Sequence, residues 1–404
     1  MVEQAQHIPA HVPPGRVAHF DFRFDPALRT DAWAPFRALA DKPDIFWSPD
    51  LGGYWVLTRC DLIEEAFRRH DLFSNRIVSI PEIPDAPPLI PNNIDPPAHA
   101  GYRKLLAQRM FSPRALGPLE ADAREMTRAL VEQVRPAGRC DFVAEIARPL
   151  PVDLFLRMMG LPTGQRDMFM PWVNGVFRPK SPEEGTAAFG GLAAFLGQWL
   201  DEAIADPSKA SGHMLPAMLS AELDGRKLTK DEMLSVWMML FLGGLDTVTS
   251  QMTHVARFLA ESPRHRELLM ADPSRIPDAI EELLRRFGIA NIGRVVARDI
   301  EFHGVAMKAG DLLLCSTPAA GIDDRAFERP LDVDFERENR RDHCAFGSGP
   351  HLCPGAYLAR VQVRVLIEEM MPRLPSLRVE PGATIAGLSG GTLTLEKLPL
   401  LWDA

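Results

Sequence analysis

The feature that most limits how this chain can fold is one long helical pattern near its middle. Thr229 is followed three residues later by Glu232, which makes a capping box, and the next stop signal is the pair Ser262-Pro263. A helix over residues 229–260 would be about 48 Å long, so we predict that it runs through the centre of the molecule. The pattern contains Gly243 and Gly244, and each glycine costs about 1 kcal/mol inside a helix. Because the pair destabilises the helix, we expect it to serve a specific function.

The remaining patterns predict a mostly α-helical fold with small β-sheets. Apolar residues recur at helical spacing over residues 31–41, 60–70, 98–111, 117–134, 184–205, 276–287 and 355–371. Short alternating stretches predict strands near residues 54–58, 294–297, 311–314 and 393–398. No repeat or flexible linker divides the 404 residues, so we expect a single domain over 1–404 with an N-terminal arm over about 1–25. The segment Ile80–Pro97 has seven prolines, but the apolar residues between them favour a packed loop over a solvated linker.

Charge and cysteine content exclude several classes of protein. With 45 Lys and Arg against 54 Asp and Glu, the chain lacks the basic field that binds nucleic acid or an anionic membrane. Its five cysteines include no C-x-x-C pair, which excludes a readable disulfide framework or zinc ribbon. The longest apolar run, Met233–Leu245, has 13 residues, and the N-terminus has no apolar signal region. We therefore expect a soluble cytoplasmic protein that neither spans nor binds a membrane.

A cysteine near the C-terminus lies in a glycine-rich string that leads directly into a helical pattern. The string runs from Phe346 to Gly355 and contains Cys353. A helix N-terminus stabilises a thiolate through its dipole and its free N–H groups, and the glycines let the backbone approach a large flat group. The alternative is that Cys353 is a small core residue, as most single cysteines are.

The complete string resembles the cysteine loop of the cytochrome P450 haem-thiolate monooxygenases. The family pattern has Phe, Gly, Arg or His, Cys and Gly at fixed spacing, and each fixed position is filled here, by Phe346, Gly349, His351, Cys353 and Gly355. The resemblance implies that Cys353 is the axial ligand of haem b iron and that Phe346, His351 and Gly355 surround the cofactor. In such enzymes the thiolate donates electron density that promotes O–O cleavage.

The glycine pair of the long helix is followed by Asp246 and Thr247, which resemble the oxygen-activation stretch of the same family. A small residue leaves space for O₂ beside the helix, and an acid next to an alcohol can relay protons. We therefore expect Asp246 and Thr247 to be catalytic. The alternative is a threonine that hydrogen-bonds back to its own helix, which is common.

The resemblance also implies structural and cofactor-binding roles for charged residues elsewhere. Glu282 and Arg285, three residues apart, would form a structural network with Arg337, although such a pair is often an ordinary surface salt bridge. Four cationic side chains would bind the haem propionates. They are His99, Arg103, Arg294 and His351.

Within the family the chain is most similar to the bacterial camphor hydroxylase group. That likeness implies a single oxygen atom inserted from O₂ into an unactivated C–H bond. The positions matching its substrate pocket are mostly apolar with several small side chains. They are Pro87, Leu89, Asn92, Met239, Leu242, Gly243, Ala290, Gly391 and Thr392. The camphor enzymes have a tyrosine where Pro87 stands and an aspartate where Ile292 stands. We therefore expect an apolar terpenoid other than camphor, a norisoprenoid or a monoterpenoid.

The chain contains no flavin domain, iron–sulfur cysteine spacing or nucleotide loop, so the two electrons must come from other proteins. By resemblance these are a [2Fe–2S] ferredoxin and its NADH-dependent flavoprotein reductase. An acidic ferredoxin would need a local basic face on this acidic chain to dock. The alternative is that the basic residues named next are ordinary solvated surface charges. The candidates are Arg103, Lys104, Arg109, Arg340 and Arg341. Two other functions stay open, a peroxide-using peroxygenase and a non-catalytic haem-thiolate sensor or carrier.

Overall fold

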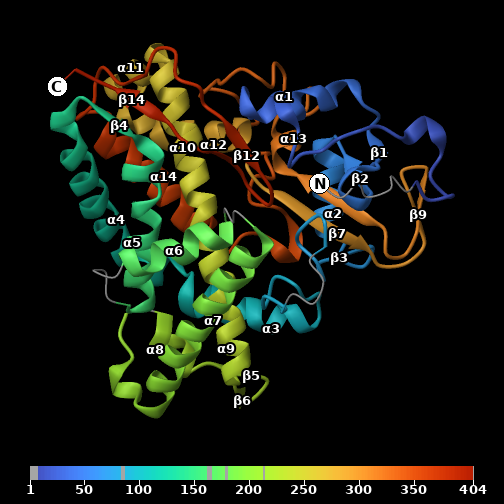
Figure 1. The fold of residues 1–404 in the computed structure, drawn as a ribbon, viewed down its shortest axis with the longest axis horizontal. Helices are drawn as coiled ribbons and strands as arrows, with labels where there is room; N and C mark the ends of the chain where they lie inside the picture. The colour runs from blue at the N-terminus through green and yellow to red at the C-terminus, as the bar shows by residue number, and fades with distance from the viewer. Residues whose placement is uncertain (1–7, 83–86, 162–165, 178–180, 213, 404) are drawn as a thin grey trace.

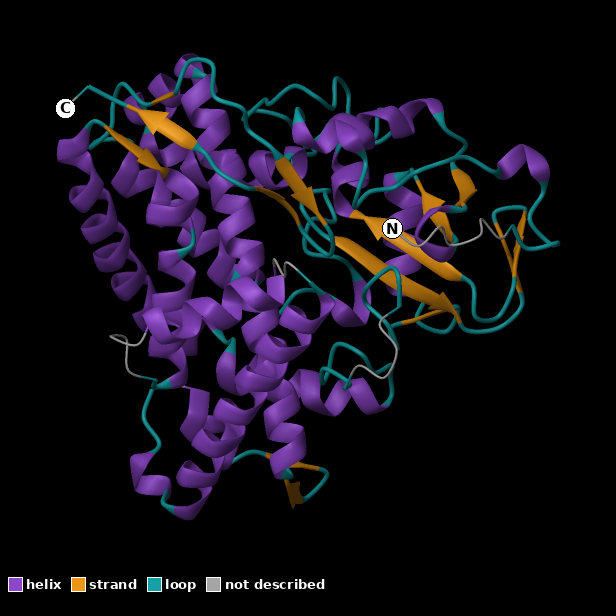
Figure 2. Ribbon diagram, viewed as in Figure 1, coloured by secondary structure: helices purple, strands orange, loops and turns teal. Residues whose placement is uncertain are grey.

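We describe the protein from a computed structural model, which covers residues 8–82, 87–161, 166–177, 181–212 and 214–403. Most helices gather on one side of the molecule, and most strands lie on the other with the N-terminal segments (Figure 2). The predicted mostly α-helical class with small sheets is confirmed.

The central helical segment is present, with one break. It consists of α9 (Lys230–Gly244) and α10 (Asp246–Glu261), which run end to end through the molecule (Figure 1). The capping box forms as predicted, since Thr229 Oγ1 accepts from the Glu232 amide and Glu232 Oε2 accepts from the Thr229 amide. Leu245, with φ −101° and ψ −64°, separates the two helices directly after the glycine pair. By length and hydropathy the whole segment could cross a membrane, but 61% of its most apolar window is buried inside the protein, as in a core helix.

The helix-rich side contains elements that the sequence patterns found and others that they missed. The segments predicted near 98–111, 117–134, 184–205 and 355–371 form α3 (Ala98–Leu105), α4 (Pro113–Val134), α7 (Pro182–Ala205) and α14 (Ala356–Met370). The patterns missed α5 (Pro149–Met159), α6 (Arg166–Phe177), α8 (Met214–Leu219) and α11 (Pro263–Ala271). The reason in α5 is that ten of its eleven residues are buried, so it has no polar face to produce a helical period. In α6 an internal proline, Pro171, obscures the pattern.

The strand-rich side is built on one mixed sheet. Its order is β1 (Ile45–Ser48), β2 (Tyr54–Leu57), β10 (Leu312–Ser316), β7 (Asn291–Val296) and β3 (Phe73–Ser74). Only the β2–β10 pair is parallel among these described strands. The predicted helix over 31–41 is only a short α1 (Ala34–Arg37) followed by a 3₁₀ turn over 38–41, whereas the segments near 60–70 and 276–287 form α2 (Cys60–Arg68) and α12 (Ile276–Arg286).

Two clusters of buried apolar side chains hold the two sides together. One cluster joins the mixed sheet to α2, α10, α12 and α14, and the other fills the space among α4 to α9. A two-stranded hairpin, β12 (Gly387–Ser389) with β13 (Leu393–Leu395), lies beside α10. The described part of the proline-rich segment is packed, because Ile80 is buried and Leu89 and Ile90 are half-buried. Ile83, which we expected to pack inward as well, lies outside the described residues.

Candidate active site

Cys353 lies in a tight loop that enters α14. Gly347 and Gly349 have φ values of 72° and 70°, a region that side chains other than glycine rarely adopt. A Cβ on Gly349 would also lie 2.8 Å from the Arg68 Cα, so only glycine lets the loop pack against α2. The Cys353 amide donates to the Phe346 carbonyl at 2.9 Å, which closes the loop.

The Cys353 sulfur is buried, and the groups around it offset only part of the rise in its thiol pKa that burial causes. Burial raises the pKa of the Cys353 thiol, whereas hydrogen bonds from the Gly355 and Ala356 amides and the charges of Arg103 and Arg360 lower it. Arg360 lies 4.6 Å from the centre of the Phe346 ring and binds Glu281 at 2.6 Å. A metal ion bound to this sulfur would deprotonate it outright, and the surrounding donors would then stabilise the thiolate.

Two arginines and two histidines from three separate segments meet beside this loop. The His99 and His351 rings are 4.1 Å apart, and Arg103 donates to the Leu352 carbonyl. Arg294 is buried on β7, and its guanidinium lies 5.2 Å from the Phe67 ring. The structure therefore brings together all four residues that we expected to bind the haem propionates.

This cluster contains buried side-chain nitrogens that the described protein groups leave without a hydrogen-bond partner. Arg294 Nε and His351 Nε2 are buried without a hydrogen-bond partner. Burial, followed by the charges of His99, Arg294 and Arg103, lowers the pKa of His351 to about 3. Two propionate carboxylates would satisfy these donors and balance the charge, so the residues fit haem b.

The sequence patterns missed one member of this cluster, His70. His70 lies near both His99 and His351, and its Nδ1 atom is buried without a hydrogen-bond partner. His70 follows α2 in an ordinary run of charged residues, and no motif marks it. Only the packing of α2 against the cysteine loop reveals it.

The break between α9 and α10 places Thr247 beside open space. Thr247 Oγ1 donates to the Gly243 carbonyl at 2.8 Å, so the back-bonded arrangement that we considered as an alternative is present. The next threonine, Thr249, donates to the Leu245 carbonyl at 3.0 Å and to the Ala147 carbonyl at 3.1 Å. Apart from its chain neighbours and its own helix backbone, a Cβ on Gly243 would meet no atom within 4 Å, which leaves room for a ligand. Asp246 is buried next to Thr247.

The residues predicted for the substrate pocket come from four parts of the chain. Leu89, Met239 and Leu242 are half-buried and pack against the same apolar cluster. Ala290 pairs with Thr392 in an isolated β-bridge, which brings the hairpin next to β7. Pro87 is exposed, and the described contact of Asn92 is through its carbonyl, which accepts from Asn75 Nδ2 at 3.2 Å.

The sequence patterns also missed the residue that attaches the hairpin. The buried side chain of Asn291 donates to Ser389 Oγ at 3.3 Å and to the Gly390 carbonyl at 3.2 Å. Its Oδ1 atom accepts from Ser316 Oγ at 2.8 Å. A polar residue at the start of a mostly apolar strand is the signal in the sequence, and it does not identify the partners.

The network of Glu282, Arg285 and Arg337 is buried, so it is not an ordinary surface salt bridge. Glu282 and Arg285 are 0% exposed and make two hydrogen bonds of 2.8 Å, and Arg337 Nε binds the same carboxylate at 3.1 Å. Arg285 also donates to the carbonyls of Gly321 and Asp332. The network thus holds the segment that precedes the cysteine loop.

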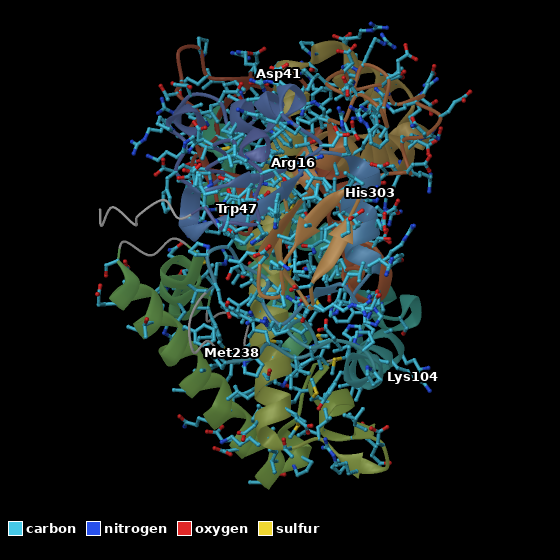
Figure 3. The ribbon with its side chains drawn as sticks, turned by 90° about the vertical axis from the view of Figure 1, so that its right-hand side faces the viewer. Arg16, Asp41, Trp47, Lys104, Met238 and His303 are labelled. Atoms are coloured by element: carbon cyan, nitrogen blue, oxygen red, sulfur yellow. The ribbon has the colours of Figure 1, made fainter. Side chains whose placement is uncertain are left out.

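Of the basic residues expected at a docking face, only some are available in the described structure. Lys104 is exposed and points outward from α3 (Figure 3), and Arg103 is half-buried. Arg340 and Arg341 both bind Asp278, at 2.9 and 3.1 Å, and this single carboxylate balances only one of the two positive charges. The Arg109 side chain lies outside the described part of the structure.

Comparisons with known proteins agree with this geometry. The sequence model for cytochrome P450 matches residues 198–382. The chain is 32% identical to "Probable cytochrome P450 127A1" of Sinorhizobium fredii over 98% of this chain and 97% of that protein. It is 30% identical to "Steroid C26-monooxygenase" of Mycobacterium tuberculosis over 92% of this chain and 94% of that protein.

Solved structures show the same likeness. A crystal structure of CYP101J2 matches with a TM-score of 0.90 and 32% identity, covering 98% of this chain and all of that one. A crystal structure of CYP101C1 matches with a TM-score of 0.91 and 30% identity at the same coverage.

Proposed function

Because this chain belongs to the cytochrome P450 family, and is therefore a haem b-dependent monooxygenase, we propose that it hydroxylates an apolar terpenoid, a norisoprenoid or a monoterpenoid. Haem iron ligated by a thiolate supplies O₂ activation and the insertion of one oxygen atom into a C–H bond. The protein supplies the thiolate of Cys353, the shape of the pocket and the delivery of protons.

The substrate class is supported by the apolar side chains at the positions that we expect to line the pocket. Leu89, Met239 and Leu242 have unbranched or γ-branched apolar side chains. There is also space beside two glycines, because a Cβ on either Gly243 or Gly391 would meet no atom within 4 Å other than those of its chain neighbours or its own helix backbone. The position occupied by a tyrosine in the camphor enzymes is Pro87, which offers no hydrogen-bond donor. Such a site favours substrates that bind through apolar surface rather than through a fixed polar contact.

We assign proton delivery to Thr247 and Asp246. The Thr247 hydroxyl, which donates to the Gly243 carbonyl at 2.8 Å, can turn toward a ligand in the open space beside Gly243. Asp246 is the adjacent acid and can replace the proton that the hydroxyl gives up. This pair favours an O₂-using enzyme over a peroxygenase or a haem sensor, since neither needs delivered protons.

The proposed electron donor is a [2Fe–2S] ferredoxin served by an NADH-dependent flavoprotein reductase, which implies a cytoplasmic location. Its docking face would lie over the cysteine loop, where Arg103 of α3 reaches the Leu352 carbonyl, and would include the exposed Lys104 and two further exposed side chains. These are Leu352, which is 45% exposed, and Tyr357, which is 42% exposed. An apolar centre with basic residues at its edge suits an acidic partner.

The test is a panel of terpenoids screened by the spectral shift of the purified holoenzyme, followed by turnover with ferredoxin, reductase and NADH. We expect tight binding of β-ionone or a related norisoprenoid and one hydroxylated product per NADH. Product formed with hydrogen peroxide but not with the electron-transfer proteins would identify a peroxygenase. Ligand binding without any product would identify a sensor or carrier.

A further inference from the structure

We propose that Ser235 is a positioning residue of the substrate pocket, and that its hydroxyl holds the proline-rich loop against α9. The inference rests on the proposed function, because it concerns the same pocket. It adds a residue that lies outside every motif in the sequence and that touches neither the cofactor nor the reacting atoms.

The geometry at Ser235 is a two-point clamp. Its Oγ accepts from the Ile90 amide at 2.9 Å and donates to the Pro88 carbonyl at 2.6 Å. These two backbone groups flank Leu89, which is one of the residues predicted to contact substrate. The clamp therefore fixes the backbone on both sides of a pocket side chain.

The composition of the loop explains why such a clamp is needed. Pro87, Pro88 and Pro91 have no amide hydrogen, so this stretch cannot form a regular ladder of backbone hydrogen bonds. The Leu89 amide instead binds Asn93 Oδ1 at 3.2 Å, which is a bond within the loop itself. Hydrogen bonds from side chains of other elements, such as Ser235, must then hold the loop in place.

The position of Ser235 on α9 connects the clamp to the pocket. Met239 and Leu242 follow it by four and seven residues, so all three share one face of the helix. Leu89, Met239 and Leu242 pack against one apolar cluster, and Gly243 comes next at the open space beside Thr247. The distance between the loop and this face sets the width of the pocket, and Ser235 sets that distance.

The chemistry of the clamp defines a matched pair of variants. The hydroxyl must accept and donate at the same time, which threonine can also do and valine cannot. Ser235→Thr and Ser235→Val add the same bulk and differ only in the hydroxyl. Ser220→Ala removes an exposed serine hydroxyl at the end of α8 and serves as the unrelated control.

The experiment uses the holoenzyme and three readouts: the dissociation constant for β-ionone, the dissociation constant for imidazole, and hydrogen exchange of the Ile90 amide. In Ser235→Val we expect β-ionone to bind about tenfold more weakly, because two hydrogen bonds that order the pocket wall are lost. Imidazole binding should change less than twofold, because this small ligand of the iron does not need the loop. Exchange of the Ile90 amide should become at least about tenfold faster, while Ser235→Thr and Ser220→Ala behave as the parent does.

Several outcomes would overturn the clamp. It is wrong if Ser235→Val leaves both β-ionone binding and Ile90 exchange unchanged, or if Ser235→Thr loses as much as Ser235→Val. Should the valine variant fail to take up haem, Ser235→Ala provides the same readouts without added bulk. If the parent enzyme binds no terpenoid, the proposed substrate class fails, and the exchange of Ile90 still decides whether the clamp exists.

Discussion

Replacing Glu282 by glutamine should strongly destabilise the protein, because it leaves two buried guanidinium groups without their counter-charge. Glu282 and Arg285 are 0% exposed, Arg337 is buried, and the carboxylate accepts hydrogen bonds of 2.8 to 3.2 Å from both arginines. Glutamine keeps the shape but removes the charge and turns an amide donor toward a cation. Breaking a buried ion pair costs about 3–5 kcal/mol, which is a large part of the roughly 5–15 kcal/mol that stabilises a folded protein.

The assay is thermal unfolding of the holoenzyme, followed by circular dichroism and by loss of haem absorption. For a chain of 404 residues we expect the Tm of Glu282→Gln to fall by roughly 4–6 °C. The matched control is Glu336→Gln, since Glu336 is 74% exposed and binds Arg275 at 2.8 Å, and its Tm should stay nearly constant. Equal and small shifts in the two variants would refute the argument that burial makes this network essential.

Four further results are expected. Cys353→Ala should abolish the red-shifted absorption of the reduced carbon monoxide complex, and retention of that band would remove Cys353 as the ligand. Thr247→Ala should bind haem and substrate normally but release severalfold more hydrogen peroxide per NADH consumed, and unchanged coupling would remove its proton-delivery role. Lys104→Glu should slow reduction by ferredoxin, most at low salt, and Lys397→Glu should not; equal rates would move the docking face elsewhere. Burial lowers the pKa of His254 from 6.5 to about 4, so between these pH values the unfolded chain binds more protons than the folded protein. The free energy of unfolding should therefore fall by up to about 3 kcal/mol from pH 6.5 to 4. His254→Asn should reduce this loss, which urea titrations at each pH can measure.

Features encoded in neighbouring residues could be predicted from the sequence. The capping box of Thr229 and Glu232, the cysteine loop and the helix after it depend on contacts only a few residues apart, and the structure contains all of them. The helices that the sequence patterns missed depend instead on contacts with elements that are distant in the sequence. In α5 the surrounding elements bury every face, so no local period of polar and apolar residues remains.

The sequence by itself thus determined the family and, through it, the cofactor, because a complete local motif carries them, and the same motif predicts Cys353 as the thiolate. Only the tertiary structure decided which side chains act together across long separations. It brings His70 near His99 and His351, joins Ser235 to the proline-rich loop and pairs Arg340 and Arg341 with Asp278. The physical reason is that charge balance and hydrogen-bond satisfaction depend on which groups meet in space, and a linear pattern does not contain that information.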